Sequence, residues 1–122
     1  MKVIHTDRAP AALGPYSQAY ISNGFLFTSG QIGADPATGK AGATLAEQAE
    51  QVMKNLSALL EAAGTDFTRV VKTTCFLADM GDFAEFNEIY ARYFTGKPAR
   101  SCVAVKTLPK ELLVEVELNA EV

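Results

Sequence analysis

Two charged residues stand in the apolar C-terminal part of the sequence. Arg100 opens an apolar run directly after Lys97-Pro98-Ala99, and Glu115 lies in the run that follows the next turn. Arg and Glu are rarely buried unless they are paired or used in function. A guanidinium matches a carboxylate with two parallel hydrogen bonds, and a Glu in an apolar site can hold a proton near neutral pH. The two residues therefore predict a site for a small carboxylate-bearing substrate with one acid–base group.

A structural ion pair between Arg100 and Glu115 is the alternative interpretation. The spacing does not say whether the two residues meet within one chain or across a subunit boundary. Glu117 shares a strand face with Glu115, since side chains repeat every two residues along a strand. One of these two glutamates could therefore be a solvent-exposed residue without a role in the site.

Three further positions carry groups that a ligand could use. A Gly-Pro turn fixes the place of Tyr16, whose phenol either packs on a strand edge or lines a pocket. Gly30, which follows Ser29, lets the backbone approach a ligand closely with its N–H as donor, although a Ser-Gly pair at a strand end is often only a turn. Asn87 lies beside the apolar stripe of a helix, where it is either exposed or a satisfied polar group of the site.

The reactive residue types form no familiar catalytic or metal set. Cys75 and Cys102 lie in apolar runs where thiols act as small buried hydrophobes, although the nearness of Arg100 leaves Cys102 open to a role in the site. The single histidine, His5, is expected on the surface, which argues against serine nucleophile chemistry and a metal centre. With no phosphate loop or nicotinamide fingerprint, an enzyme of this size would act without a cofactor, through positioning and acid–base help.

Length and composition predict one domain over residues 1–122, with 48% hydrophobic residues available for a core. The net charge is −3, and the Lys and Arg residues are scattered rather than gathered into the basic stripe of a nucleic-acid-binding protein. No apolar run has the length of a membrane span, and the first residues do not resemble a signal peptide. We expect a cytosolic protein without a nucleic-acid or membrane partner.

The elements that must position these residues follow the order β-β-β-α-β-α-β-β. Asn23-Gly24 favours a type I′ hairpin turn, and Thr44 with Glu47 forms a capping box for the first helix, which Gly64 ends. Strands are expected over residues 2–5, 17–22, 25–29, 69–78, 98–106 and 113–120, and helices over 44–64 and 82–96, the latter ended by Gly96.

Two helices in crossover connections cover one face of a five- or six-stranded sheet and leave the other face bare. On the central strand, the bare face carries one of two alternating sets, Val70, Lys72, Thr74 and Phe76 or Val71, Thr73, Cys75 and Leu77. Either set is too apolar to be left in water, and large apolar patches mark interaction surfaces. This predicts a homo-oligomer whose subunits bury that face together.

The sequence resembles the RidA (YjgF-like) family over essentially the whole chain. The similar segments are Gly14-Pro15-Tyr16-Ser17-Gln18-Ala19, Thr28-Ser29-Gly30-Gln31-Ile32, Val70-Val71-Lys72-Thr73-Thr74, Asp82-Phe83, Asn87-Glu88-Ile89-Tyr90, Pro98-Ala99-Arg100-Ser101-Cys102 and Val114-Glu115-Val116-Glu117. The resemblance implies an α+β, chorismate-mutase-like domain: a mixed, mostly antiparallel sheet of about six strands with two helices on one face. It also implies a homotrimer with clefts between subunits. The implied activity is cofactor-free hydrolysis of 2-imino acids and their enamine tautomers, such as 2-aminoacrylate, 2-iminopropanoate and 2-iminobutanoate, to 2-keto acids and ammonia.

The resemblance also implies roles for single residues. Arg100 falls on the position that binds the substrate carboxylate, and Glu115 on the position that activates water. The remaining pocket positions are Tyr16, Ser29, Asn87 and Cys102, with the backbone N–H near Gly30 as a further donor. The sequence departs from the family in a shorter segment before Pro98 and in a more polar end at 118–120.

Two other functions compete with hydrolysis. A binding or regulatory module could hold small carboxylates in the same cleft without chemistry. An RNA-cleaving translation inhibitor is the third possibility, and the acidic net charge argues against it.

Overall fold

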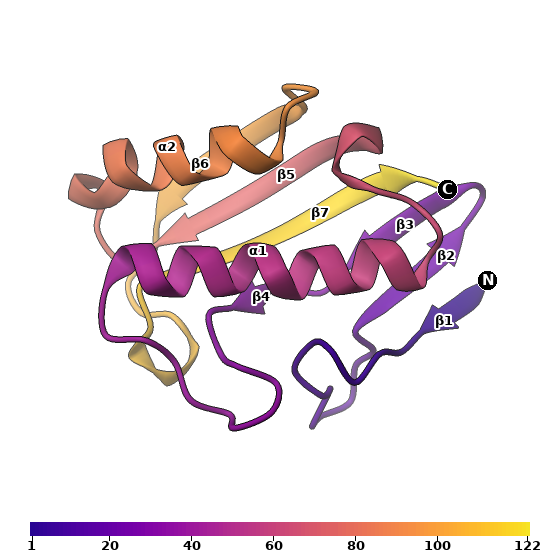
Figure 1. The fold of residues 1–122 in the computed structure, drawn as a ribbon, viewed down its shortest axis with the longest axis horizontal. Coiled ribbons are helices and arrows are strands. Elements are labelled where there is room, and N and C mark those ends of the chain that lie inside the picture. Colours follow the sequence, from indigo (N-terminus) through magenta and orange to yellow (C-terminus); the bar gives the residue numbers. More distant parts are fainter.

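The computed structural model describes all residues 1–122 and places two helices on one face of a mixed sheet (Figure 1). The seven-stranded sheet has the order β1-β2-β3-β7-β5-β6, with β4 also paired to β7, and only the β5–β6 pair is parallel. The strands are β1 (Lys2–Ile4), β2 (Ala19–Ser22), β3 (Phe25–Thr28), β4 (Gln31–Ile32), β5 (Val70–Leu77), β6 (Ala99–Ala104) and β7 (Val114–Glu121). The helices are α1 (Leu45–Ala62) and α2 (Phe83–Tyr93), with short 3₁₀ turns η1 (Phe67–Arg69), η2 (Met80–Asp82) and η3 (Pro109–Glu111). The α+β prediction is confirmed, and neither helix is long and apolar enough to cross a membrane.

Both ends of α1 follow from local sequence. The Glu47 N–H donates to Thr44 Oγ1 at 3.2 Å, the first bond of the predicted capping box. The Glu47 carboxylate accepts from the Thr44 hydroxyl at 2.9 Å, where a capping box would have the Thr44 backbone N–H as donor. At the other end, Gly64 adopts a φ of 79° and Thr65 N–H reaches back to Leu60 O at 2.9 Å. A left-handed glycine of this kind lets the last carbonyls of the helix find donors.

The end of α2 differs from the prediction. The helix stops at Tyr93, and Lys97, not Gly96, takes the left-handed conformation, with a φ of 52°. Tertiary packing accounts for the difference, because Phe94 leaves the helix to be buried between Phe67, at 5.0 Å, and Tyr90, at 4.3 Å. Burial of a large aromatic side chain outweighs the propensity of one glycine.

A β-bulge sets which side chains of β5 face the helices. The pairing of β5 with β7 shifts register between Val70 and Lys72. Val70 is buried, and regular alternation of buried and partly exposed side chains begins only at Lys72. Thr73, Cys75 and Leu77 are buried under the helices, and Lys72, Thr74 and Phe76 face the other side. Neither of the two predicted sets is therefore right in full, because a bulge inserts one residue and reverses the phase of the strand.

The face of the sheet without helices is apolar, as predicted. Register places Val3, Tyr20 and Phe27 on it, and Val103 shares it with Phe76. Val3, Tyr20, Phe25, Phe27 and Val103 are between 38% and 53% exposed, and Phe76 is partly buried. The helix-covered face of β7, in contrast, is buried at Val114, Val116, Leu118 and Ala120. The chain therefore has one completed core and one apolar surface in contact with solvent.

Candidate functional site

Arg100 lies on the edge strand β6 with its side chain under α2. Its Nη1 donates a hydrogen bond to Asn87 Oδ1 at 2.8 Å, and its guanidinium carbon lies 4.6 Å from the centre of the Tyr90 ring. No carboxylate lies within 4.0 Å of Arg100, so an ion pair between Arg100 and Glu115 within the chain is wrong. A half-buried guanidinium that is oriented but unpaired is suited to bind an anionic ligand.

A cavity of about 420 Å³ opens beside this guanidinium. Its lining includes Asn87, Tyr90, Phe94, Pro98 and Arg100. Asn87 is thus a satisfied polar group of the site rather than an exposed helix residue, because its side-chain oxygen accepts a hydrogen bond from the Arg100 guanidinium. This half of the site has two cationic side chains, Arg100 and Lys97, and aromatic walls, a combination that fits a small carboxylate.

Cys102 lies two residues after Arg100 on the same face of β6 and is half-buried. Burial raises the pKa of its thiol, an effect that the positive charge of Arg100 partly offsets. Its register partner on β5 is Cys75, where burial raises the pKa to about 12. Both thiols are free and protonated at neutral pH, so Cys102 offers a weak S–H donor rather than a nucleophile, and it does not line the cavity beside Arg100.

Glu115 lies on β7 in register with Phe76, on the sheet face without helices. Burial raises the pKa of its carboxyl group, and the charge of Glu117 on the same face raises it further. Its carboxylate accepts no hydrogen bond and forms no ion pair within the chain, so both oxygens are available to a ligand or water. A carboxyl group with a raised pKa in a cavity is a candidate general base.

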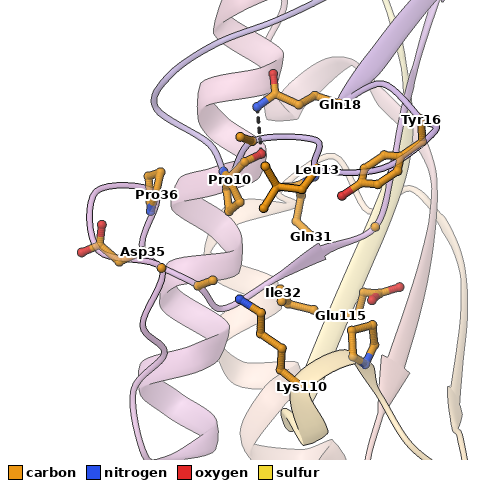
Figure 2. Close-up of a pocket in the computed structure, with 15 residues that line it drawn as sticks. Pro10, Leu13, Tyr16, Gln18, Gln31, Ile32, Asp35, Pro36, Lys110 and Glu115 are labelled. Atoms are coloured by element: carbon orange, nitrogen blue, oxygen red, sulfur yellow. Dashed lines mark hydrogen bonds between the residues drawn. The ribbon is translucent and has the colours of Figure 1, made fainter.

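Glu115 borders a second cavity, of about 450 Å³, that also contains Tyr16 and Gly30 (Figure 2). The hydroxyl of Tyr16 points into this cavity, and Tyr16 N–H bonds Gly14 O at 2.8 Å in the predicted turn. Ser29 donates its hydroxyl to Ser17 O at 2.6 Å, so it ties the Tyr16 loop to the end of β3. Tyr16 therefore lines a pocket, as one of its two interpretations predicts.

Gly30 is required by the position of Glu115. A Cβ atom at residue 30 would lie 2.7 Å from the carboxyl carbon of Glu115, and real Cβ atoms essentially never show contacts this short. The Glu115 side chain therefore lies directly over the Gly30 backbone. The structure therefore has a close approach to the Gly30 backbone, but the group that makes it is the Glu115 side chain rather than a ligand.

Replacing Gly30 with Ala should displace the Glu115 carboxylate while leaving the fold intact, because the clash is with the end of a side chain rather than with backbone. Misplacement of a reacting group by about 1 Å can cost roughly 10²-fold in rate. We expect turnover of the proposed substrate to fall by that order with a nearly unchanged melting temperature. Gly96→Ala is the control, since its Cβ would meet Thr68 O at 3.4 Å. Full activity of Gly30→Ala would contradict the placement of Glu115.

The predicted site residues form two groups on opposite faces of the sheet. Arg100 is the register partner of Thr73, which is buried under α2, whereas Glu115 pairs with Phe76 on the other face. Successive side chains of a strand point to opposite faces, and a sheet cannot be crossed by a small ligand. Asn87 and Cys102 lie with Arg100, and Tyr16, Ser29 and Gly30 lie with Glu115. One chain alone therefore presents two half-sites.

Comparison with known proteins identifies the family of this chain. Residues 6–122 match the sequence family described as endoribonuclease L-PSP. The chain belongs to this family, the RidA (YjgF-like) family. A 2-iminobutanoate/2-iminopropanoate deaminase from Rattus norvegicus is 52% identical over 121 residues, which are 98% of this chain and 88% of that protein.

Other relatives carry different names. A Lactococcus lactis protein named as a regulator, AldR, is 52% identical over 124 residues, covering 100% of this chain and 98% of that protein. The crystal structure of E. coli TdcF with bound serine has a TM-score of 0.96 at 40% identity, and the match covers 100% of this chain and 99% of that chain. Membership of the RidA family and its fold are thus shown, whereas the names of the relatives include both an enzyme and a regulator.

Several residues around the two half-sites were not singled out from the sequence. Lys110 lines the Glu115 cavity from η3, where its φ is 57°, and Leu13 lines it from the loop before β2. Tyr90 lies in the core, and its ring also faces Arg100. The spacing of Phe83, Asn87 and Tyr90 along one helix face is the signal that could have connected them. No three His, Cys, Asp or Glu side chains gather as a metal site.

Proposed function

We propose that this protein hydrolyses small 2-imino acids and their enamine tautomers to 2-keto acids and ammonia. The observation that carries the proposal is the unpaired Arg100 guanidinium, oriented by Asn87 and Tyr90 beside a cavity. The name of the Rattus norvegicus relative, 2-iminobutanoate/2-iminopropanoate deaminase, supports the choice of imine substrates. A guanidinium recognises the carboxylate that all these substrates share, and a carboxylate base can activate water.

The two half-sites meet, in this proposal, across the interface of a homotrimer. In this arrangement, a second copy of the chain packs against the sheet face without helices, because that face exposes large apolar side chains and carries Glu115. Arg100 of one subunit would then face Glu115 of the next. The split of the candidate residues supports this arrangement, because no single chain brings them together.

In the proposed mechanism, Arg100 binds the substrate carboxylate and the Gly30 backbone N–H orients the substrate. The imine nitrogen first takes a proton from solvent. Glu115 then accepts a proton from water while the water oxygen bonds to the imine carbon, which gives a carbinolamine. Glu115 returns its proton to the carbinolamine nitrogen, the C–N bond breaks, and the O–H proton passes to solvent as the keto acid and ammonia form. The sum is one imine and one water converted to one keto acid and one ammonia. Enamine tautomers enter this sequence after protonation at carbon by solvent.

The decisive experiment generates 2-aminoacrylate or 2-iminobutanoate enzymatically in the presence of the purified protein and follows the release of keto acid and ammonia. Acceleration over the spontaneous reaction is the expected result. Binding of a 2-keto acid without any acceleration would instead favour the binding module, an alternative that the regulator name of the L. lactis relative supports. The net charge of −3 weighs against the ribonuclease alternative.

The assembly gives its own prediction. Light scattering should return about three times the chain mass of 13.1 kDa. Phe27→Lys introduces a charge into the exposed apolar face, so we expect this variant to dissociate and lose turnover together. Met80→Lys is the matched control, because Met80 is 44% exposed in η2, outside the sheet. A monomeric wild-type protein with full activity would rule out the shared site.

The pH dependence follows from the pKa of Glu115. A general base works deprotonated, so a raised pKa moves the acid limb of kcat/KM to higher pH, with its midpoint above the ordinary value of 4.5. Burial is the larger cause and Glu117 the smaller, so Glu117→Gln should shift the midpoint downwards but only part of the way. The check is a pH–rate profile of both proteins. An upward shift in Glu117→Gln would contradict the assignment.

A further inference from the structure

Three residues of α2 surround the Arg100 guanidinium on one helix face. Phe83, Asn87 and Tyr90 are spaced four and three residues apart, so their side chains lie on one side of the helix. The guanidinium carbon is 5.3 Å from the Phe83 ring centre and 4.6 Å from that of Tyr90, and Asn87 accepts its hydrogen bond at 2.8 Å. The helix thus provides two aromatic faces and one acceptor for a single cation.

The Tyr90 ring is itself fixed from two directions. Its hydroxyl lies 2.7 Å from Thr73 Oγ1 in a buried hydrogen bond, and Phe94 stacks on the ring at 4.3 Å. Thr73 is the register partner of Arg100 on the neighbouring strand. Arg100 on β6 is thus connected to Thr73 on β5 by strand pairing, Thr73 to Tyr90 on α2 by the hydrogen bond, and Tyr90 to the Arg100 guanidinium by the cation–π contact.

We infer that Tyr90 and Thr73 are positioning residues that hold the Arg100 guanidinium ready for the substrate carboxylate, an inference that rests on the proposed function. An arginine side chain loses much rotamer freedom when it binds a ligand in one geometry, and a preformed support removes part of that cost. Tyr90 is 7% exposed and its hydroxyl is engaged by Thr73, so it acts through Arg100 and transfers no proton to the substrate.

This role differs from that of a core aromatic residue. A core role needs only volume, which Phe or Leu would supply, whereas the positioning role needs both the ring face toward Arg100 and the hydroxyl toward Thr73. Burial raises the pKa of Tyr90, in keeping with a phenol that stays protonated as part of the support. The effect of its loss should appear in carboxylate affinity, and much less in the chemical step at Glu115.

The test measures the Kd for 2-ketobutyrate by titration, and kcat and KM separately, for Tyr90→Leu, Tyr90→Phe, Thr73→Val and Thr73→Ser. Loss of the cation–π contact should weaken 2-ketobutyrate binding by roughly 3- to 30-fold in Tyr90→Leu. Loss of the hydroxyl bond alone should weaken it by about 2- to 10-fold in Tyr90→Phe or Thr73→Val. Thr73→Ser keeps the hydroxyl and should bind as the wild type does.

A double-mutant cycle separates coupling from general damage. If Tyr90 and Thr73 act as one unit, Tyr90→Phe combined with Thr73→Val should bind no more weakly than either single variant. Tyr93→Phe is the matched control on the same helix, because its hydroxyl bonds Glu50 on the α1 side and not Thr73. We expect its Kd to be unchanged.

Two outcomes would overturn the inference, and a third would contradict the proposed function on which it rests. Unchanged Kd in folded Tyr90→Phe and Thr73→Val contradicts positioning, even if Tyr90→Leu fails to fold. A fall in kcat with constant KM in Tyr90→Phe would make Tyr90 a catalytic residue instead. Failure of the wild-type protein to bind 2-ketobutyrate would contradict the proposed function itself, and that result is distinguishable because it precedes any substitution.

Discussion

Glu115→Gln should lower imine hydrolysis by roughly 10²- to 10⁴-fold, the usual contribution of general-base help. Gln keeps the shape of the side chain and can still orient a water, but it cannot accept the proton. Arg100 lies in the other half-site of the chain, so binding of a 2-keto acid product should survive. The measurement is single-turnover hydrolysis of enzymatically generated imine beside a product titration.

Glu117→Gln is the matched control, because Glu117 lies on the same strand face but is exposed. We expect it to keep most activity at neutral pH. Full activity in Glu115→Gln together with loss in Glu117→Gln would reverse the choice between the two glutamates.

Thermal melting separates lost chemistry from lost folding in Glu115→Gln. The folded state holds the Glu115 proton more tightly than the unfolded chain, since burial raises its pKa above 4.5. The stability from this group is therefore present below that value and is lost as the pH rises through the raised pKa. At neutral pH an ionised Glu115 destabilises the folded state because it is partly buried, whereas Gln carries no charge. The inactive Glu115→Gln variant should therefore melt at a temperature no lower than that of the wild type.

Arg100→Lys should lose most affinity for 2-keto acids and most hydrolysis while remaining a folded trimer. Lysine keeps the charge but not the planar fork, and it cannot lie flat on the Tyr90 ring at 4.6 Å. Charge-assisted hydrogen bonds contribute about 1.5–3 kcal/mol each, so loss of one bond of a bidentate pair weakens binding by roughly 10- to 150-fold. Calorimetric titration with 2-ketobutyrate measures this change.

The same position tests a structural role against a binding role. Removing one partner of a buried ion pair costs about 3–5 kcal/mol, but Arg100 has no carboxylate partner within the chain. Arg100→Ala should therefore melt close to the wild type with binding and turnover gone. Arg92→Ala is the control, because Arg92 pairs with Glu50 at 2.7 Å on the surface and should leave binding unchanged. Loss of folding in Arg100→Ala would favour the structural role.

The sequence by itself determined the local features of this protein. The Thr44–Glu47 box and Gly64 bound α1, and Asn23-Gly24 turn the first hairpin with φ angles of 52° and 80°. The two-residue spacing of Glu115 and Glu117 predicted that they share one face of β7, and Val114, Val116 and Leu118 are buried on the other face. These features depend on neighbours within a few residues, so local chemistry is sufficient to specify them. The types of Arg100 and Glu115 likewise indicated carboxylate binding and acid–base chemistry before any geometry was known.

Only the tertiary structure decided how the candidate residues are grouped. The two-residue β4 is too short to be seen in a pattern and exists because Gln31 and Ile32 pair with Val116 and Glu115 of β7. The bulge after Val70 reverses the phase of β5, which no periodicity could reveal. Placement of Arg100 under α2 and Glu115 on the opposite face depends on pairing between residues far apart in sequence. Such pairing is fixed by packing of the whole sheet, which local sequence does not encode.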